Sequence, residues 1–241
     1  MGTSRRPLIA AVGLDFEAAA ANGAGIEVVS GLNRQRYLRK LHEVARTGVQ
    51  GIISFGVAGG LSPELNAGDV VVASAVVTAR RTFRPGNLWL EALLAALPHA
   101  YHRPVFGARM PLFTVSAKKA LWDSTGCATV DMESRDAAEV AAHYGLPFAV
   151  LRVVLDPARR AIPLAALAGA DSEGKTGAKA VVKSLLRRPG DLPALVQIAI
   201  DAQKANSSLH RSRKALGPLF AFREQDERSQ GEELRRHVSA G

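Results

Sequence analysis

Two acidic residues, Asp131 and Glu133, lie in the segment ATVDMESRDAAEV, where an apolar run gives way to an Ala-rich helical pattern. If residues 127–133 are extended, both carboxylates lie on one side of the chain and Met132 lies on the other. Carboxyl ends of strands are where open α/β sheets bind ligands, and two carboxylates there can grip vicinal hydroxyls and offset positive charge on a ribose ring. Acidic residues also suit the first turn of a helix, so the pattern leaves both roles open.

A third acid, Asp156, ends the apolar run PFAVLRVVLD, just before Pro157. Arg152 lies in the middle of this run, and a buried guanidinium requires partners. Partial desolvation raises the pKa of a carboxyl group at a strand end, which suits that group to donate a proton to a leaving purine. An Asp before Pro also commonly caps a turn. The segment therefore predicts either a general acid or a turn residue.

The segment GIISFGVAGGLSPELNAGDVVV places three glycines, Gly56, Gly59 and Gly60, directly after a predicted strand. Glycines there let backbone N–H groups approach a ligand without obstruction by a Cβ atom. The spacing is not the GxGxxG of a dinucleotide site, and the Lys-Ser/Thr pair of a P-loop is missing. Alone, this turn is more typical of a structural than of a catalytic feature.

Alternating apolar and Ala-rich runs predict the elements that position these residues. The result is an α/β fold: a single domain whose central, mixed but mostly parallel β-sheet is flanked by helices. Strands are expected at 7–14, 26–30, 49–55, 69–77, 127–131 and 147–155. Helices are expected at about 34–46, 88–96, 117–124 and 134–144.

After Asp156 the pattern is helical only, with segments expected near 163–167, 175–187 and 191–214. Asp191 can cap the last helix, and Pro193 suits its first turn. We expect a catalytic domain over residues 1–216 and a mobile tail over residues 217–241, because the tail has mixed charge and weak periodicity. Phe220 and Phe222 could nevertheless dock on the domain.

Composition excludes several classes of protein. The lone Cys127 cannot form an intrachain disulfide, and no His/Cys spacing suggests a metal site. Asp15 and Glu17 interrupt what would be the apolar core of a secretory signal, and no stretch reaches about 18 uninterrupted apolar residues. We therefore expect a cytoplasmic protein without a membrane span.

Positive charge is concentrated toward the C-terminus. The net charge is +9, and residues 175–214 hold nine Lys or Arg against two Asp. Such a field attracts nucleic acid, anionic lipid or phosphate-bearing substrates, although it also describes a solvated basic face. No aromatic or zinc pattern typical of nucleic-acid binding accompanies it, so we expect no nucleic-acid partner.

Taken together, GVAGGL, DMES and RVVLD resemble the AGGL-type loop, the (D/E)ME cluster and the R-x-x-S/N-D strand of the purine nucleoside phosphorylase and methylthioadenosine/adenosylhomocysteine nucleosidase superfamily. The resemblance covers roughly residues 7 to 190, in order. Within it, GLDFEA, SFGVAGGL, DMES and LRVVLDPARRAIP most resemble the hopanoid-associated phosphorylases, which remove adenine from adenosylhopane.

The resemblance implies roles for particular residues. Glu133 would bind the ribose 2′ and 3′ hydroxyls, and Asp156 would protonate or hydrogen-bond the purine N7. The expected substrate-binding residues are Ala58, Gly59, Gly60, Val130, Asp131 and Met132. Ser30, Gly31 and Arg34 would contact the nucleophile, which is either phosphate or water. Arg34 and Arg36 could equally be exposed on the first turn of a helix.

Three positions depart from the family pattern. Asn33 stands where the SGxG loop has its second glycine, which puts phosphate binding in doubt. Glu17 lies near the position of the water-activating acid, but its spacing from Gly13 is one residue short. Leu155 replaces a polar residue that helps to orient the catalytic Asp, so Asp156 could be less well positioned.

The resemblance implies cleavage of the N-glycosidic bond of an adenine nucleoside, with release of adenine from adenosylhopane. No metal or organic cofactor is required, and inorganic phosphate is a candidate co-substrate. The alternatives are a methylthioadenosine/adenosylhomocysteine nucleosidase, a general purine nucleoside phosphorylase, or a non-catalytic nucleoside-binding protein. We also expect a homo-oligomer, with peripheral contact between the basic C-terminal helices and an anionic membrane surface. The basic residues expected at this contact are Lys183, Arg187, Arg188, Arg211, Arg213 and Lys214.

Overall fold

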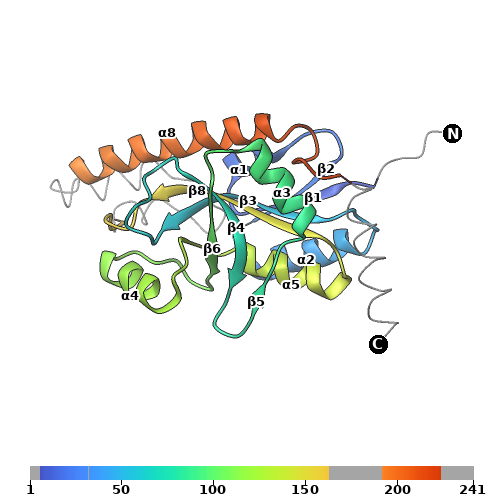
Figure 1. The fold of residues 1–241 in the computed structure, drawn as a ribbon, viewed down its shortest axis with the longest axis horizontal. Coiled ribbons are helices and arrows are strands. Elements are labelled where there is room, and N and C mark those ends of the chain that lie inside the picture. Colours follow the sequence, from blue (N-terminus) through green and yellow to red (C-terminus); the bar gives the residue numbers. More distant parts are fainter. Residues whose placement is uncertain (1–5, 32, 163–191, 224–241) are drawn as a thin grey trace.

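The apolar runs of the sequence form the strands of one mixed sheet, and helices cover both of its faces (Figure 1). The computed structural model describes residues 6–31, 33–162 and 192–223. The strands are β1 (Leu8–Val12), β2 (Ile26–Ser30), β3 (Ile52–Gly60), β4 (Val70–Val77), β5 (Thr82–Phe83), β6 (Tyr101–Gly107), β7 (Thr129–Asp131) and β8 (Phe148–Asp156). The helices are α1 (Asp15–Ala21), α2 (Arg34–Ala45), α3 (Asn87–Ala96), α4 (Val115–Thr125), α5 (Ser134–Tyr144) and α8 (Leu192–Ala215).

Parallel pairing dominates the described sheet, whose order is β2-β1-β3-β7-β6-β4-β5. Parallel ladders join β1 to β2 and β3, β3 to β8, and β6 to β4 and β7. Antiparallel ladders join β3 to β7, β4 to β5, and β4 to β8. The predicted single-domain α/β fold with a mixed, mostly parallel sheet is thus confirmed. Because β8 pairs with both β3 and β4, strands β3, β8, β4, β6 and β7 also close into a ring, which local periodicity could not predict.

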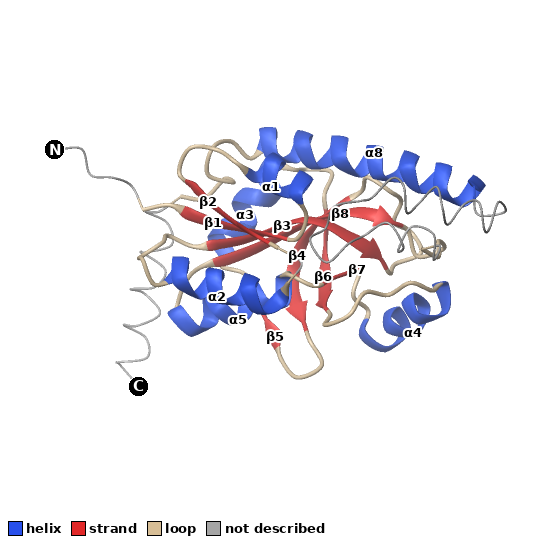
Figure 2. Cartoon of the chain, turned by 180° about the vertical axis from the view of Figure 1, so that it is seen from behind, coloured by secondary structure: helices blue, strands red, loops and turns tan. Residues whose placement is uncertain are grey.

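Helices α2 and α5 cover one face of the sheet, and α1, α3 and α8 cover the other (Figures 1 and 2). Side chains alternate along β8 accordingly: Phe148 and Val150 pack in the core beside α2 and α5, and Ala149 and Leu151 pack in the opposite core. Arg152 continues the first series. It therefore lies on the face that α5 covers, and this places the guanidinium beside the acids at the start of α5.

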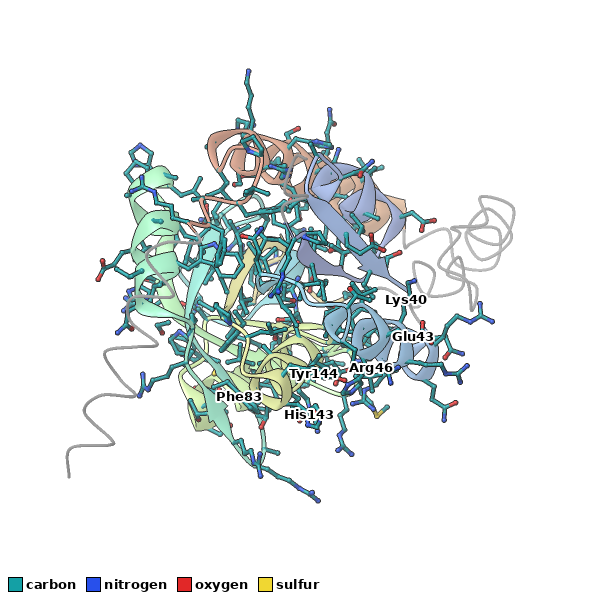
Figure 3. All side chains as sticks on the ribbon, turned by 90° about the vertical axis from the view of Figure 1, so that its right-hand side faces the viewer. Lys40, Glu43, Arg46, Phe83, His143 and Tyr144 are labelled. Carbon is teal, nitrogen blue, oxygen red and sulfur yellow. The ribbon has the colours of Figure 1, made fainter. Side chains whose placement is uncertain are left out.

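Helix α2 shows how the pattern separates core from solvent. Tyr37 and Leu41 are buried against the sheet, and Lys40, Glu43 and Arg46 lie on the exposed outer face (Figure 3). The apolar stripe at helical spacing is the feature that made this helix predictable.

Several elements differ from the predictions. Strand β3 continues through Gly60, so the three glycines lie within the strand and not in a loop after it. The first predicted strand ends at Val12, and α1 begins at Asp15. Strand β6 and the short β5 were not predicted, because YHRPVFG mixes polar residues and Pro104 into the run and gives no clear period. The helices expected at 163–167 and 175–187, and the cap Asp191, lie outside the described residues.

The chain remains packed beyond α8. Trp89 Nε1 donates a hydrogen bond to the Phe220 carbonyl at 2.8 Å, and the Phe55 and Phe220 rings contact each other edge to face. Phe220 and Phe222 are both buried. The boundary expected after residue 216 therefore does not mark the end of the packed domain, which extends at least to residue 223. Residues 224–241 lie outside the described part of the chain.

Candidate active site

Asp156 is the last residue of β8, and it lies beside Gly59 of β3. The register between the two strands shifts at Ala58 and Gly59, so Asp156 emerges at an irregularity of the ladder. A Cβ atom on Gly59 would lie 3.3 Å from Val130 Cγ1 and 3.4 Å from Asp156 Oδ2. Glycine therefore allows the acid to pack directly against the strand.

Lys118 of α4 is a fully buried partner of Asp156. Its ammonium group donates a hydrogen bond to Asp156 Oδ2. It also reaches the backbone carbonyls of Asp156 and Pro157, both at 3.1 Å, and that of Arg160 at 2.9 Å. Burial raises the pKa of Asp156, and the positive charge of Lys118 opposes that rise. Lys118 thus fixes the orientation of Asp156, a role that the apolar side chain of Leu155 cannot fill.

Arg152 is fully buried and organises the sugar-side acids. Its Nη2 atom lies 2.9 Å from Asp131 Oδ1 and 3.9 Å from Glu133 Oε2, and it donates to the Ser54 hydroxyl. One guanidinium therefore joins strands β3, β7 and β8 to the start of α5. The guanidinium thus has the charged partners that the sequence indicated, through its Nη2 atom.

Asp131 has a mainly structural role. Its Oδ1 atom accepts hydrogen bonds from the backbone N–H groups of Glu133 at 2.9 Å and Ser134 at 2.7 Å, in addition to that from Arg152. Strand β7 ends at Asp131, as predicted, so the condition under which both carboxylates lie on one side of an extended chain is not met. The Asp131 carboxylate instead accepts hydrogen bonds from the backbone N–H groups at the start of α5, and the chain turns there.

Glu133, the other acid at the start of α5, can also meet a ligand. Burial raises its pKa to about 7, the positive charge of Arg152 opposes this, and the nearby carboxylates Asp131 and Glu17 raise it further. A Cβ atom on Gly13 would lie 2.6 Å from Glu133 Oε1, so glycine at position 13 makes room for this carboxylate.

Glu17 is buried, and its carboxylate is occupied by the backbone. It accepts hydrogen bonds from the N–H groups of Gly13 and Leu14, both at 2.8 Å, and of Val57 at 2.6 Å. Burial raises its pKa, whereas Arg152 and these N–H groups lower it. Glu17 therefore ties the start of α1 to strand β3.

Replacing Gly56 by Ala should destabilise the protein by about 1 to 3 kcal/mol, as overpacking of a core does. The new Cβ atom would overlap the Glu17 carboxylate and lie 2.9 Å from Arg152 Nη1. Denaturant titration measures the loss. An unchanged or raised midpoint, the usual result of Gly→Ala at an unstrained site, would contradict this packing.

Unsatisfied polar groups gather around Glu133. Within the described residues, buried atoms without a hydrogen-bond partner include the Tyr37 hydroxyl, Asp131 Oδ2, Ser134 Oγ, and Nε and Nη1 of Arg152. Buried polar atoms are normally hydrogen-bonded, so such a cluster is suited to a polar ligand or to ordered water. Tyr37 was not anticipated, because its helical spacing marks it only as a core residue.

A cavity of about 160 Å³ joins the base-side and sugar-side acids. Of the predicted residues, it is lined by Ala58, Gly59, Val130, Asp131, Met132, Glu133 and Asp156. Met110, Pro111, Leu112 and Ile162 add an apolar wall. Gly60 and Glu17 are not among the lining residues; Gly60 packs tightly against Pro157 and Val154.

The residues expected to hold the nucleophile lie outside this cavity. Ser30 and Gly31 are exposed at the end of β2. Asn33, which replaces the family's glycine, caps α2 by accepting a hydrogen bond from the Arg36 N–H at 3.1 Å. Arg34 is half-exposed and forms a 2.7 Å ion pair with the buried Asp136. Its guanidinium is therefore already engaged by α5.

Lys118 is the most important residue of the site that the sequence did not lead us to predict. It lies on the same side of α4 as Leu121 and Trp122, three and four positions later. A lysine within such an apolar stripe is a signal of a buried charge that needs a partner. Its neighbour Lys119 lies off that stripe and is 72% exposed.

Comparison with known folds agrees with this geometry. Futalosine hydrolase of Helicobacter pylori superposes with a TM-score of 0.60 at 14% identity, over 88% of this chain and 97% of that one. The 5′-methylthioadenosine/S-adenosylhomocysteine nucleosidase of the same species gives 0.60 at 15% identity, over 88% and 97%. The corresponding nucleosidase from Colwellia psychrerythraea, in complex with adenine, gives 0.58 at 16% identity, over 89% and 96%.

The sequence itself places the chain in a family. No curated protein sequence matches it. The model of the phosphorylase superfamily, however, matches residues 28–187, which is more than half of the chain and includes the glycine-rich strand and all residues of the cavity. The chain therefore belongs to the phosphorylase superfamily and is an enzyme of the phosphorylase/nucleosidase type.

Proposed function

We propose that the enzyme cleaves the N-glycosidic bond of an adenine nucleoside and releases adenine. The observation that carries this proposal is that Asp156 and Glu133 line one small cavity, with Ala58 and Gly59 between them. A base-side acid and a sugar-side carboxylate are the two groups that such a cleavage requires. Two of the similar structures are nucleosidases, and one of these holds adenine.

At the base, Asp156 donates a proton to purine N7. Its Oδ2 atom is held by Lys118, and no hydrogen bond to Oδ1 is formed within the described residues. Burial raises the pKa of this carboxyl group, which favours the protonated donor. The C1′–N9 bond then breaks with both electrons going to adenine, whose charge the proton at N7 neutralises.

At the sugar, the Glu133 carboxylate accepts hydrogen bonds from the ribose 2′ and 3′ hydroxyls. Its negative charge stabilises the cationic ribosyl group that forms as the base leaves. Arg152, 3.9 Å away, favours the charged form of Glu133 that this role requires. An oxygen of water or of hydrogen phosphate forms the new bond to C1′. The proton that this water or hydrogen phosphate loses on forming the bond restores the acid.

Affinity for the nucleoside should depend on the ionisation of Glu133. The pKa of Glu133 is about 7, and only its carboxylate accepts both hydroxyl hydrogen bonds. In an Asp156→Asn background, where Asp156 no longer titrates, binding of adenosine should weaken about tenfold for each pH unit below about 7 and level off above it. Isothermal titration calorimetry between pH 5 and 9 measures this. The same pH dependence after adding Glu133→Gln would refute the assignment.

We further propose that the substrate carries a large apolar 5′ substituent, as adenosylhopane does. The resemblance of GLDFEA, SFGVAGGL, DMES and LRVVLDPARRAIP to the hopanoid-associated phosphorylases supports this. So does the apolar wall of the cavity, in which Met110 is 75% exposed. An exposed methionine in an apolar cavity wall suits contact with a lipid chain.

Assays of adenine release distinguish the candidate substrates and nucleophiles. The substrates are adenosine, methylthioadenosine and adenosylhopane, each tested with and without millimolar phosphate. The proposal expects the highest kcat/KM with adenosylhopane. Equal kcat/KM for all three would reject the narrower substrate, and a preference for methylthioadenosine would identify a methylthioadenosine nucleosidase. Adenine release that requires phosphate indicates phosphorolysis, and adenine release at a rate independent of phosphate indicates hydrolysis.

We also propose that the enzyme is a homo-oligomer that meets such a substrate at an anionic membrane surface. Among the described residues, no helix has the length and apolarity needed to cross a membrane. Val196 and Ile200 of α8 are nevertheless exposed apolar residues, and Arg211 follows them on an exposed part of the helix. Of the other basic residues expected at this surface, Lys183, Arg187 and Arg188 lie outside the described residues.

Arg213 is not available for that surface. Its guanidinium donates to the carbonyls of Ala21, Gly217 and Pro218 and lies 4.2 Å from the centre of the Phe220 ring. It therefore holds the C-terminal segment onto the domain. Sedimentation with anionic and neutral vesicles tests the membrane contact. Binding should increase with the anionic lipid content and decrease with the salt concentration. Binding that is independent of both would reject the proposed contact.

A further inference from the structure

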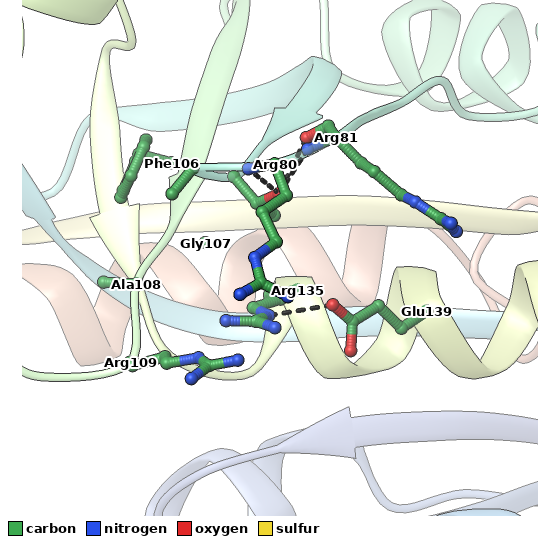
Figure 4. Close-up of a pocket in the computed structure, with 10 residues that line it drawn as sticks. Arg80, Arg81, Phe106, Gly107, Ala108, Arg109, Arg135 and Glu139 are labelled. Carbon is green, nitrogen blue, oxygen red and sulfur yellow. Dashed lines mark hydrogen bonds and ion pairs between the residues drawn. The ribbon is translucent and has the colours of Figure 1, made fainter.

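A second and larger cavity, of about 550 Å³, lies where the β4–β5 turn, the end of β6 and the first turns of α5 meet (Figure 4). Its lining includes four arginines, Arg80, Arg81, Arg109 and Arg135, and one acid, Glu139. The net formal charge of its walls is therefore three positive. None of the roles described above uses this cavity.

The arginines are held in place by the local backbone. The Thr78 hydroxyl accepts hydrogen bonds from the N–H groups of Arg80 at 3.3 Å and Arg81 at 2.9 Å, and donates to the Arg81 carbonyl at 2.8 Å. A Cβ atom on Gly107 would lie 2.6 Å from Arg135 Cβ, so glycine lets α5 approach the end of β6. A closed turn and a close helix contact therefore position the charges on separate elements.

The charges are only partly compensated. Arg135 Nε is 2.9 Å from Glu139 Oε1, one turn later on α5. Arg80, Arg81 and Arg109 have no carboxylate within ion-pair distance in the described part of the chain. In Figure 4, the side chains of Arg80, Arg109 and Arg135 extend toward the same part of the cavity, whereas that of Arg81 points away. Guanidinium groups repel one another unless an anion lies between them.

We propose that this cavity binds a phosphoryl group carrying two negative charges. Guanidinium groups match the geometry of phosphate oxygens through paired N–H donors, and several arginines from different elements favour phosphate over a single carboxylate. The volume lies within the usual range for ligand sites. The phosphoryl group can belong to a soluble diphosphate or to a lipid head group, and these two sources share the same chemistry.

The cavity adjoins the candidate active site without being part of it. The Ala108 N–H donates to the Asp131 carbonyl at 2.7 Å, and the chain then runs from Arg109, in the basic cavity, to Met110, in the wall of the smaller one. A phosphate-bearing ligand would therefore contact Arg109, whose neighbour in the chain, Met110, lines the nucleoside cavity. The inference does not rest on the proposed glycosidic cleavage, since it needs only these arginines.

Two binding experiments test the proposal. Calorimetry measures the binding of inorganic pyrophosphate, and sedimentation compares the binding of vesicles that contain phosphatidic acid with that of vesicles of pure phosphatidylcholine. Wild-type protein should bind at least one of the two phosphate probes. The double variant Arg80→Gln/Arg109→Gln should weaken that binding about tenfold or more, since each charge-assisted hydrogen bond is substantial. Pyrophosphate binding identifies a soluble source, and binding only to phosphatidic acid vesicles identifies a lipid source.

A matched control is the double variant Arg84→Gln/Arg103→Gln, which removes the same charge from exposed residues outside the cavity lining. It should change binding less than twofold. Failure of wild-type protein to bind either probe would overturn the proposal, as would an equal loss in the control, which indicates general charge attraction. A change of oligomeric mass by light scattering in Arg80→Gln/Arg109→Gln would also overturn it, because the arginines would then serve a subunit contact.

Discussion

Replacing Asp156 by Asn lowers the rate of adenine release by about 10² to 10⁴-fold, the usual contribution of a positioned general acid. The amide has nearly the same shape as the carboxylic acid and still accepts a hydrogen bond from Lys118, but it cannot transfer a proton to N7. The three backbone carbonyls around the Lys118 ammonium remain as its acceptors. The variant should therefore stay folded, and steady-state assays at matched folded fractions measure the loss.

Asp123→Asn is the control for this substitution. Asp123 is an exposed carboxylate whose ion pair, within the described residues, is with Lys119 at 2.7 Å along α4. Its loss should leave adenine release within about twofold, because an exposed pair contributes at most about 1 kcal/mol and lies outside the cavity. Near-normal release by Asp156→Asn would remove Asp156 from the mechanism.

Replacing Lys118 by Met should cost about 3 to 5 kcal/mol of stability, because it leaves Asp156 and three carbonyls without their buried partner. In the folded fraction, the pKa of Asp156 should rise, since the ammonium group favours the ionised carboxylate. Adenine release should fall, because no other side chain of the described part of the chain forms a hydrogen bond with this carboxyl group. Denaturant titration measures the stability, and carboxyl ¹³C chemical shifts measure the pKa.

Lys119→Met is the matched control, since the two lysines are adjacent on one helix. Lys119 is 72% exposed, and its pair with Asp123 is a surface pair. Its replacement should change stability by less than about 1 kcal/mol and leave the pKa of Asp156 unchanged. Equal effects of the two substitutions would show that Lys118 does not act through Asp156.

The parts of the site that the sequence predicted are those whose chemistry is local. Asp156 ends a long apolar run, and Glu133 directly precedes an amphipathic helix, so both positions follow from periodicity. The strand order, by contrast, depends on contacts between distant segments. The closure of the sheet through β8 brings Lys118 to Asp156 and Arg152 to Asp131, which are 38 and 21 residues apart. Local pattern carries no signal for such pairings.

The glycine-rich segment was assigned to the correct place but to the wrong local structure. A loop was expected because glycine weakens strands, yet β3 runs through Gly60. The glycines are needed because other groups come close: Glu17 and Arg152 at Gly56, and Asp156 at Gly59. Tertiary packing therefore explains these glycines. Residue spacing alone does not distinguish glycines required by packing from those of a ligand-binding loop.

The role of Asp131 shows the same limit. The sequence pattern presents Asp131 and Glu133 as an equivalent pair, but Asp131 Oδ1 is already occupied by three hydrogen bonds, and only its Oδ2 atom is left for a ligand. The deciding contacts are two backbone N–H groups and a guanidinium from another strand. The alternative interpretation, an acidic residue that suits the start of a helix, was nearer to the observed role of Asp131.

Simultaneous measurement of free adenine and of the ribosyl product by liquid chromatography and mass spectrometry tests the central claim most directly. Wild-type enzyme incubated with an adenine nucleoside should yield the two products in equal amounts, and the rate of formation of both should fall by about 10² to 10⁴-fold in Asp156→Asn. Recovery of every nucleoside intact, or a product in which the adenine is altered while the glycosidic bond survives, would contradict the account.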